Sequence, residues 1–266
     1  MTRITPMDYS LFDRPEIVHL LFHPRPEYFT SKTQENKTDV LIPVEEDVVI
    51  GASFHIYDRT APNILFFHGN GEIVADYDEL APVYTNMGVN FLAVDYRGYG
   101  RSTGNPTVSH MMNDCHVILD FVRNWLTENK HEAPLAVMGR SLGSASALEL
   151  VTHHHDTIDG LIIESGFAYL LPLLELIGIN VSKLGLSEEA GCRNIEKISA
   201  FEKPTLIIHA ENDHIIPFSD GKTLFTASGA EEKKFLKIDG ANHNDILYRG
   251  FRVYLQGVYN LLQALQ

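Results

Sequence analysis

The sequence contains few cysteines, and this scarcity limits how the chain is stabilised. Cys115 and Cys192 are the two cysteines among 266 residues. Two thiols this far apart in the chain do not build a disulfide scaffold or a cysteine-rich metal cluster. A reducing compartment accounts for their small number, so we expect a cytoplasmic protein.

Basic side chains are also scarce relative to acidic ones. The chain carries 21 Lys and Arg against 35 Asp and Glu, which gives a formal net charge of −14 at pH 7. A surface of this charge repels both nucleic-acid phosphates and anionic lipid headgroups. We therefore expect no nucleic-acid partner and no electrostatic attachment to a membrane.

Long hydrophobic runs are missing as well. The longest apolar stretches, such as residues 170–179, end well short of the roughly 20 residues that cross a bilayer. Near the N-terminus, Asp8, Asp13 and Arg14 interrupt the apolar residues, so the continuous apolar core of a secretory signal is not found. The sequence predicts no integral membrane segment and no export.

The remaining composition is that of an ordinary globular protein, with 44% hydrophobic and 21% charged residues. It excludes a disordered chain, a collagen-like repeat and a coiled coil. The length fits one α/β domain, because such folds run to about 250 residues as a single unit. We therefore interpret residues 1–266 as one domain, with a polar N-terminal arm at residues 1–38.

Apolar runs and helical periods alternate along most of the chain. Residues 39–44 and 48–56 flank an acidic turn and predict a β-hairpin. The later apolar runs are residues 64–67, 91–94, 135–138, 161–163, 205–208 and 235–238. Runs without polar alternation suit strands buried on both faces, and helical segments between them suit a parallel sheet. Apolar stripes at 108–126 and 247–265 predict two long helices that pack on this sheet.

One connection is longer than a parallel sheet requires. Residues 166–203 join the sixth strand to the seventh, whereas a loop between a strand and a helix usually takes about 2 to 6 residues. The segment contains Phe167 and many leucines. We expect it to form a small lid over a pocket, and its apolar content favours an acyl or other hydrophobic substrate group. Packing of the lid onto the body would account for the same residues equally well.

A G-x-S-x-G sequence at residues 139–143 lies between an apolar strand and a helix-compatible run. In this context it is typical of a nucleophile elbow, where a serine occupies a sharp turn and the flanking glycines keep side chains out of its way. Ser141 is the candidate nucleophile. The alternative is a glycine-bracketed turn whose serine only caps the helix.

A serine nucleophile needs a histidine base and an acid that orients the base, in the chain order Ser, Asp, His. Asp213 lies in a polar loop after the strand at 205–208, and His243 lies in a loop after the strand at 235–238. We predict that Asp213 is the acid and His243 the base. Glu164, at the end of the strand before the lid, is the alternative acid.

The tetrahedral intermediate also needs backbone N–H donors. A glycine-bearing loop follows the strand at 64–67, and we predict that the N–H groups of Asn70 and Leu142 form the oxyanion hole. His68 in this loop is interpreted as a structural anchor. The spacing Gly69-x-Gly71 is also compatible with a dinucleotide-binding fingerprint, but the third small position falls on Val74.

The sequence resembles the α/β-hydrolase superfamily, and in particular the branch of protein depalmitoylases and related serine hydrolases. The motifs that carry the resemblance are His68-Gly69-Asn70-Gly71, Asp95-Tyr96-Arg97-Gly98-Tyr99-Gly100-Arg101-Ser102, Gly139-Arg140-Ser141-Leu142-Gly143 and His243-Asn244-Asp245. They extend over nearly the whole chain from about residue 48. The resemblance implies an α/β-hydrolase fold with a mostly parallel eight-stranded sheet, a Ser/His/Asp triad, and no metal or organic cofactor.

The expected reaction is hydrolysis of a small-molecule carboxylic ester or thioester through an acyl-enzyme intermediate. Because the same triad also serves amide hydrolysis and acyl transfer to other acceptors, these reactions remain open. A non-catalytic binding protein on the same fold is the other alternative.

Overall fold

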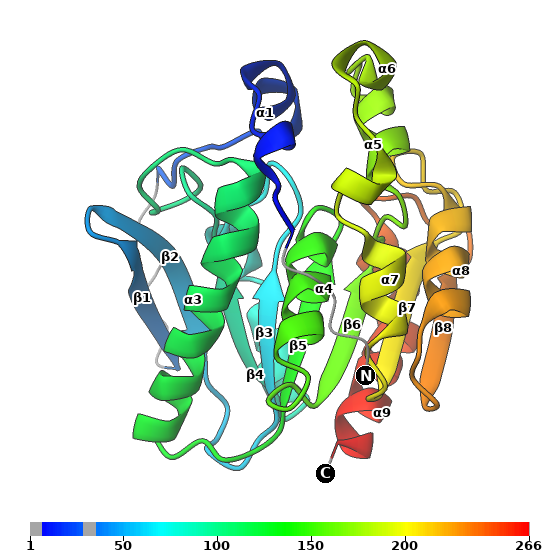
Figure 1. Cartoon of the computed structure of the whole chain (residues 1–266). Coiled ribbons are helices and arrows are strands. Elements are labelled where there is room, and N and C mark those ends of the chain that lie inside the picture. Colours follow the sequence, from blue (N-terminus) through cyan, green and yellow to red (C-terminus); the bar gives the residue numbers. More distant parts are fainter. Residues whose placement is uncertain (1–6, 29–35, 266) are drawn as a thin grey trace.

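The computed structural model describes residues 7–28 and 36–265. At its centre lies one eight-stranded sheet with the order β1-β2-β4-β3-β5-β6-β7-β8 (Figure 1). The strands are β1 (Lys37–Glu45), β2 (Val48–His55), β3 (Asn63–Phe67), β4 (Asn90–Val94), β5 (Leu135–Arg140), β6 (Gly160–Glu164), β7 (Thr205–Ala210) and β8 (Lys233–Ile238). Each of them overlaps an apolar run of the sequence, so the predicted eight-stranded sheet is confirmed.

The sheet is mostly parallel, as predicted. β1 and β2 form an antiparallel hairpin, and β2 also pairs antiparallel with β4. The other neighbouring strands, from β4 through β3 to β8, are parallel. Every residue of β3, β4 and β6 is buried, because helices cover both faces of the sheet. These strands therefore lack a polar face, which is why their sequences do not alternate.

The helices form one layer on each face of the sheet (Figure 1). The first layer contains α3 (Val108–Glu128), α4 (Gly143–His153), α7 (Asn194–Ser199) and α8 (Phe218–Ala227). The second contains η2 (Val74–Tyr77), α2 (Ala81–Asn86) and α9 (Ile246–Ala264). The two long predicted helices, α3 and α9, thus pack on opposite faces. None of the helices in the described ranges has the length and apolarity needed to cross a bilayer.

The N-terminal arm packs into the core, although its sequence is largely polar. It contains η1 (Ser10–Phe12) and α1 (Pro15–Leu21). Five of its apolar side chains are at most 5% exposed and join the core cluster of the first helix layer: Tyr9, Phe12, Ile17, Leu21 and Phe22. Residues 7–28 are therefore part of the domain body. β1 begins at Lys37, just inside the range predicted for the arm.

The long connection between β6 and β7 forms four short helices. They are α5 (Leu170–Leu176), α6 (Val181–Leu184), η3 (Glu188–Ala190) and α7. α7 packs against α4 and α8, so it is the crossover helix of this connection, and the segment before it is the insertion. α5 and α6 rise from the same end of the molecule as α1 (Figure 1).

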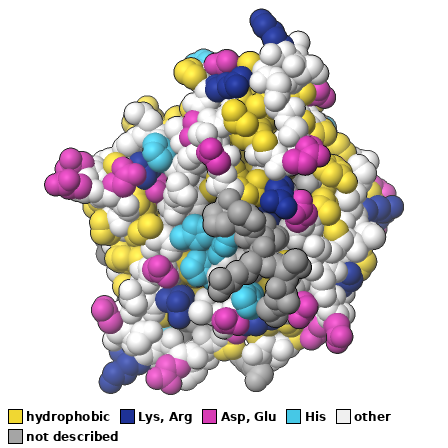
Figure 2. Space-filling model, in the orientation of Figure 1, with side chains coloured by type: hydrophobic (Ala, Val, Ile, Leu, Met, Phe, Trp, Pro, Cys, Tyr) yellow, Lys and Arg dark blue, Asp and Glu magenta, His cyan; other side chains and the backbone are white. Residues whose placement is uncertain are grey.

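A buried ionic cluster joins the arm to the first helix layer. Glu149 Oε2 on α4 accepts a hydrogen bond from Tyr9 Oη at 2.7 Å and pairs with Lys197 Nζ on α7 at 2.5 Å. Glu149 Oε1 lies 3.3 Å from His153 Nε2 and 3.6 Å from His116 Nε2. Histidine side chains gather on this face, over α3 and α4 (Figure 2). The side chain of Lys197 is 1% exposed, so its charge depends on Glu149 for compensation.

Replacing Glu149 with glutamine should lower the free energy of unfolding by about 3 to 5 kcal/mol at pH 7, because Lys197 is left buried without a partner charge. Burial raises the pKa of Glu149, but hydrogen bonds from His116, Lys197 and Tyr9 outweigh burial and hold the pKa well below its ordinary value of 4.5. The stability that this carboxylate contributes is therefore present above pH 4.5 and is lost as the pH falls further.

Urea unfolding of Glu149→Gln and wild type between pH 3 and pH 7 measures both effects. The difference in unfolding free energy between the two proteins should become smaller below about pH 4.5. Glu128→Gln, at the exposed end of α3, is the control and should change the unfolding free energy by less than about 0.5 kcal/mol. A decrease in unfolding free energy of less than about 1 kcal/mol in Glu149→Gln would contradict the conclusion that Glu149 compensates the buried charge of Lys197.

Candidate active site

The candidate residues lie in loops at the carboxyl ends of parallel strands. Ser141 follows β5, Asp213 follows β7, His243 follows β8 and Asn70 follows β3. These strands belong to the parallel part of one sheet, so their carboxyl ends share one edge. Residues far apart in the sequence thus come together at this edge.

Ser141 occupies a sharp turn between β5 and α4. Its φ angle is +51°, in the left-handed region that residues other than glycine rarely adopt. A Cβ atom on Gly143 would lie 2.2 Å from the carbonyl oxygen of Phe67, and one on Gly139 would lie 2.3 Å from the carbonyl oxygen of Gly143. Gly143 therefore allows the turn to approach β3, Gly139 allows the end of β5 to approach the start of α4, and the backbone strain falls on the serine.

Three side chains form a continuous hydrogen-bonded chain at this turn. His243 Nε2 lies 3.0 Å from Ser141 Oγ, and His243 Nδ1 lies 2.8 Å from Asp213 Oδ2. An ionised carboxylate only accepts hydrogen bonds, so the ring proton belongs on Nδ1 and Nε2 is left to accept from the serine hydroxyl. The structure therefore brings Ser141, His243 and Asp213 together in the order that the sequence predicts.

The surroundings of Asp213 keep it ionised. Its Oδ1 accepts hydrogen bonds from the backbone N–H groups of Ile215 at 3.0 Å and Ile216 at 2.9 Å. Burial raises the pKa of Asp213, but the hydrogen bond from His243 and these two N–H groups outweigh burial, so the pKa lies below its ordinary value. A carboxylate in this state can hold the imidazole and stabilise its protonated form.

Glu164, the alternative acid, has other partners. Its Oε1 accepts from Arg140 Nε at 3.1 Å and its Oε2 accepts from Tyr254 Oη at 2.5 Å. Burial raises the pKa of Glu164 even though Arg140 and Tyr254 act in the opposite direction. His243 Nδ1 donates its hydrogen bond to Asp213, so the geometry favours Asp213 as the orienting acid.

Residues 68–73, here called the Asn70 loop, follow β3. The side-chain amide of Asn70 faces the N-terminal arm and donates to Leu21 O at 2.7 Å. The role expected of Asn70 therefore falls to its backbone N–H. Leu142, which carries the second expected donor, directly follows Ser141 and precedes α4.

The N-terminal arm is hydrogen-bonded to the Asn70 loop, an arrangement that the sequence motifs did not predict. Asn70 Oδ1 accepts from Tyr99 Oη at 2.7 Å and from the N–H of His23 at 3.0 Å. Arg25 Nε donates to Gly71 O at 2.7 Å. Two segments about 45 residues apart in the chain thus form one hydrogen-bonded unit beside Ser141.

Buried polar contacts also fix the base of the loop. His68 Nδ1 lies 2.7 Å from Gly69 O, and His68 Nε2 lies 3.2 Å from Asp95 Oδ1. His68 thus anchors the loop. The element after the loop is η2, a four-residue 3-10 helix, so the long α-helix whose N-terminus binds pyrophosphate in dinucleotide sites is not found here.

Arg140 and Glu72, two charged residues near Ser141, were given no role by the sequence motifs. Arg140, which directly precedes the serine, forms ion pairs with Glu72 of the Asn70 loop and with Glu164. The available signal was a basic residue at the end of an otherwise apolar strand. In the part of the chain that the structure describes, no group of three or more His, Cys, Asp or Glu side chains is arranged to hold a metal ion.

Sequence comparisons identify related proteins. The pattern of the family described as "Serine aminopeptidase, S33" matches residues 58–184. The chain is 29% identical over 192 residues to "Protein bem46" of Schizosaccharomyces pombe, which covers 70% of this chain and 63% of that protein. It is 30% identical over 221 residues to "Lysophosphatidylserine lipase ABHD12" of Xenopus tropicalis, which covers 75% of this chain and 55% of that protein. The chain thus spans less than two thirds of either relative.

Solved structures with the same fold include two ester hydrolases. The Pyrococcus furiosus esterase Pf2001 superposes with a TM-score of 0.70 at 16% identity, over 91% of this chain and 99% of the esterase. A soluble variant of monoglyceride lipase from Saccharomyces cerevisiae, bound to a substrate analogue, gives a TM-score of 0.68 at 18% identity, over 91% of this chain and 98% of the lipase. Sheet order, sequence relatives and structural neighbours agree: the chain belongs to the α/β-hydrolase superfamily.

Proposed function

We propose that this protein is a serine esterase that hydrolyses carboxylic esters or thioesters of small molecules. The observation that carries the proposal is the hydrogen-bonded chain from Ser141 through His243 to Asp213, with contacts of 3.0 and 2.8 Å. A weak hydroxyl nucleophile becomes reactive when a base lies within hydrogen-bond reach and a third group orients that base. The printed names of an esterase and two lipases among the similar proteins support an ester as the bond that is cleaved.

In the proposed reaction, His243 Nε2 takes the proton of Ser141 Oγ as this oxygen attacks the acyl carbonyl carbon. The N–H groups of Asn70 and Leu142 stabilise the oxyanion that forms. His243 then donates its proton to the leaving alcohol or thiol, and the acyl group stays on Ser141. In the second half, His243 takes a proton from water, the hydroxide attacks the acyl carbonyl, and Ser141 regains a proton as the carboxylic acid leaves. Asp213 stabilises the imidazolium in both halves.

The inserted segment before α7, residues 166–193, supports an apolar acyl group as part of the substrate. A cavity of about 150 Å³ lies between α5 and the loop that carries Asp213. Its apolar lining from the inserted segment is Phe167, Pro172, Leu173 and Leu176, and Ile215 and Ile216 contribute from the acid loop. We therefore assign the segment as a lid and this cavity as the acyl site. Apolar walls with a few polar groups are typical of small-molecule sites.

The proposal needs no metal or organic cofactor, because each proton and charge in the reaction has a residue to carry it. Cys115 and Cys192 are both free and buried, which supports placing the enzyme in the reducing cytoplasm.

A fluorophosphonate probe should label the wild-type protein on Ser141, because the probe reacts with serines that an adjacent base activates. Mass spectrometry of the modified peptide identifies the site, and Ser141→Ala is the control that should remain unlabelled. Labelling followed by release of free acid from p-nitrophenyl esters supports the esterase. Folded protein that is not labelled would favour a binding protein on the same fold, and preferential transfer to added amines or alcohols would favour a transacylase.

Replacing Asp213 with asparagine should lower kcat by about 10⁴-fold, because an amide beside Nδ1 favours the wrong tautomer of His243. Steady-state hydrolysis of p-nitrophenyl butyrate measures the effect. Asp239→Asn changes an exposed carboxylate in the loop after β8 and should leave kcat within about twofold of wild type. A loss in Asp213→Asn below about tenfold would move the role of the acid to Glu164.

Replacing Leu176 with tryptophan should shift the preferred p-nitrophenyl ester to a shorter acyl chain, because the larger ring fills part of the cavity next to α5. The measurement is kcat/KM along a series from acetate to palmitate. Val117→Trp on α3 introduces the same ring at another exposed apolar position and should leave the optimum unchanged. An unchanged optimum in Leu176→Trp would remove this cavity from the acyl site.

A further inference from the structure

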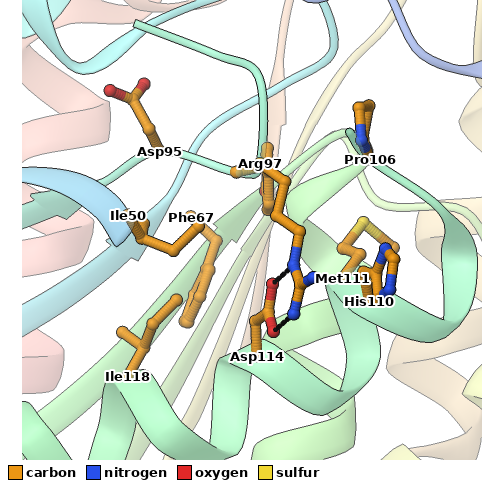
Figure 3. Close-up of a pocket in the computed structure, with 10 residues that line it drawn as sticks. Ile50, Phe67, Asp95, Arg97, Pro106, His110, Met111, Asp114 and Ile118 are labelled. Carbon is orange, nitrogen blue, oxygen red and sulfur yellow. Dashed lines mark hydrogen bonds and ion pairs between the residues drawn. The ribbon is translucent and has the colours of Figure 1, made fainter. Parts of the chain in front are cut away.

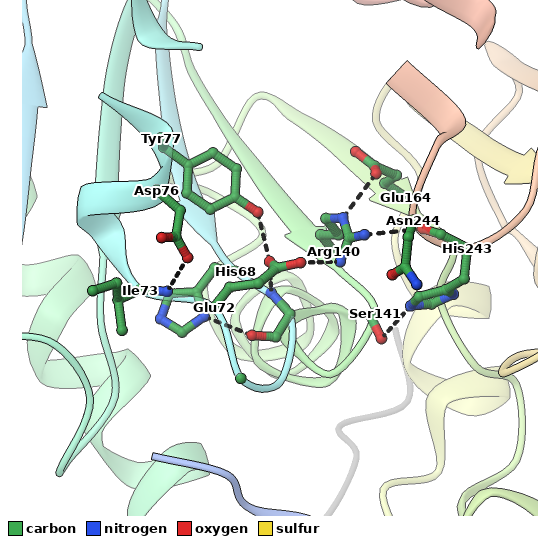
Figure 4. Close-up of polar contacts among 12 residues, drawn as sticks. His68, Glu72, Ile73, Asp76, Tyr77, Arg140, Ser141, Glu164, His243 and Asn244 are labelled. Carbon is green, nitrogen blue, oxygen red and sulfur yellow. Dashed lines mark hydrogen bonds and ion pairs between the residues drawn. The ribbon is translucent and has the colours of Figure 1, made fainter. Parts of the chain in front are cut away.

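One largely buried guanidinium, that of Arg140, contacts three separate segments of the site. Arg140 Nη1 lies 2.5 Å from Glu72 Oε1 and Nε lies 3.1 Å from Glu164 Oε1. Arg140 Nη2 donates to the backbone carbonyl oxygen of His243 at 2.9 Å. Figure 4 shows the guanidinium lying between Glu72 on one side and the His243 loop on the other. Since Arg140 directly precedes Ser141 in the chain, its side chain links the turn of the nucleophile to both neighbouring loops.

Glu72 transmits this contact to the Asn70 loop. Glu72 Oε2 accepts the N–H of Gly69 at 2.7 Å and the hydroxyl of Tyr77 at 2.6 Å (Figure 4). A Cβ atom on Gly69 would lie 2.6 Å from Arg140 Nη1. Glycine at this position therefore allows the guanidinium to approach the loop backbone.

These contacts determine where the N–H of Asn70 points. The peptide group between Gly69 and Asn70 is planar and trans, so its C=O and N–H point in opposite directions. His68 Nδ1 holds Gly69 O at 2.7 Å, and Glu72 holds the N–H of Gly69. With both ends of Gly69 fixed, the direction of the Asn70 N–H follows from the position of Glu72, and Arg140 fixes that position.

The chemistry of arginine suits this role better than that of lysine. Its planar fork presents five donors in fixed directions, so it can bind two carboxylates and a carbonyl oxygen at once. Burial lowers the pKa of Arg140, but Glu72 and Glu164 more than offset burial, and the net pKa is raised. The guanidinium is thus a permanent charge whose position depends on its partners.

We propose that Arg140, acting through Glu72 and through the His243 carbonyl, is a positioning residue that aligns the Asn70 N–H and the His243 ring with Ser141. This inference rests on the proposed esterase function. Arg140 touches neither substrate nor proton in the reaction; it sets the geometry in which the oxyanion forms. Because enzymes gain rate from donors that are already aimed at the transition state, a misaligned donor lowers kcat while substrate binding is retained.

The variants Arg140→Lys and Glu72→Gln test the proposal. Arg140→Lys keeps the positive charge but loses the planar set of guanidinium donors. Glu72→Gln keeps the shape of the side chain but loses the negative charge that pairs with Arg140. We expect each to lower kcat for p-nitrophenyl butyrate by about 10 to 100-fold with KM within about threefold of wild type, since removing an oxyanion donor outright costs about 10² to 10³ in kcat. The double variant should lose little more kcat than the less active single variant, because both residues position the same Asn70 N–H.

Asp114→Asn is the matched control for disruption of a buried ion pair. Arg97 donates two hydrogen bonds of 2.7 Å to Asp114 at a place in the fold lined by Ile50, Phe67 and Ile118 (Figure 3). Both side chains are at most 8% exposed. This variant removes one charge from an arginine–carboxylate pair, as Glu72→Gln does. It should lower the melting temperature but leave kcat within about twofold.

Two results would overturn the proposal. One is folded Arg140→Lys and Glu72→Gln proteins whose kcat stays within about twofold of wild type. The other is an equal loss of kcat in Asp114→Asn, which would assign the effect to stability alone. If wild-type protein shows no Ser141-dependent hydrolysis, the esterase function fails separately, and hydrogen exchange of the amides at 69–72 decides the positioning role. Faster exchange in Arg140→Lys and Glu72→Gln but not in Asp114→Asn supports it, and unchanged exchange overturns it.

Discussion

The turn from β5 into α4 leaves no room for a side chain at Gly139 or Gly143, and the position of Ser141 depends on this constraint. A Cβ atom at Gly143 would overlap the backbone of β3. The turn can therefore lie against β3 only with glycine at 143 and can close onto the start of α4 only with glycine at 139, and the serine takes the positive φ angle. Because β3 also leads into the Asn70 loop, the same close contact determines how far that loop lies from the serine.

The sheet and the order of the site residues could be predicted from the sequence because both depend on local patterns. Strands buried on both faces have continuous apolar runs, and loops at their carboxyl ends carry polar residues in a fixed chain order. Ser141, Asp213 and His243 follow such runs, so their strand ends are visible without coordinates. Their hydrogen bonds, and the different partners of the alternative acid Glu164, needed the structure.

The contacts that were not predicted join segments with no local pattern in common. Asn70 meets the N-terminal arm through Leu21 and His23 and the segment after β4 through Tyr99, and Arg140 meets Glu72 across 68 residues of sequence. These are polar contacts between segments that are far apart in the chain. The arm illustrates the problem, because its buried apolar side chains are spaced among charged residues that remain at the surface. Propensity and periodicity do not report such pairings.

Buried ion pairs also change how the net charge is distributed. Among the described residues, the pairs that lie largely inside the protein include Arg97 with Asp114, Arg140 with Glu164, Lys37 with Asp78 and Lys197 with Glu149. Each pair places one of the 21 basic residues and one of the 35 acidic residues in the interior, where their charges cancel. Most of the excess acid therefore belongs to the surface. A surface with so few cations repels copies of itself, which favours solubility at high concentration.

The cluster around Glu149 has a consequence for the order in which the protein is completed during synthesis. Tyr9 leaves the ribosome well before Lys197, whose Nζ lies 2.9 Å from the tyrosine hydroxyl in the finished fold and is 188 residues later in the chain. Until α7 emerges, Glu149 has no ammonium partner and would be buried at a cost. Closing the arm onto α4 before α7 has emerged therefore buries Glu149 without its ammonium partner, so we expect the arm to dock after α7 has been made.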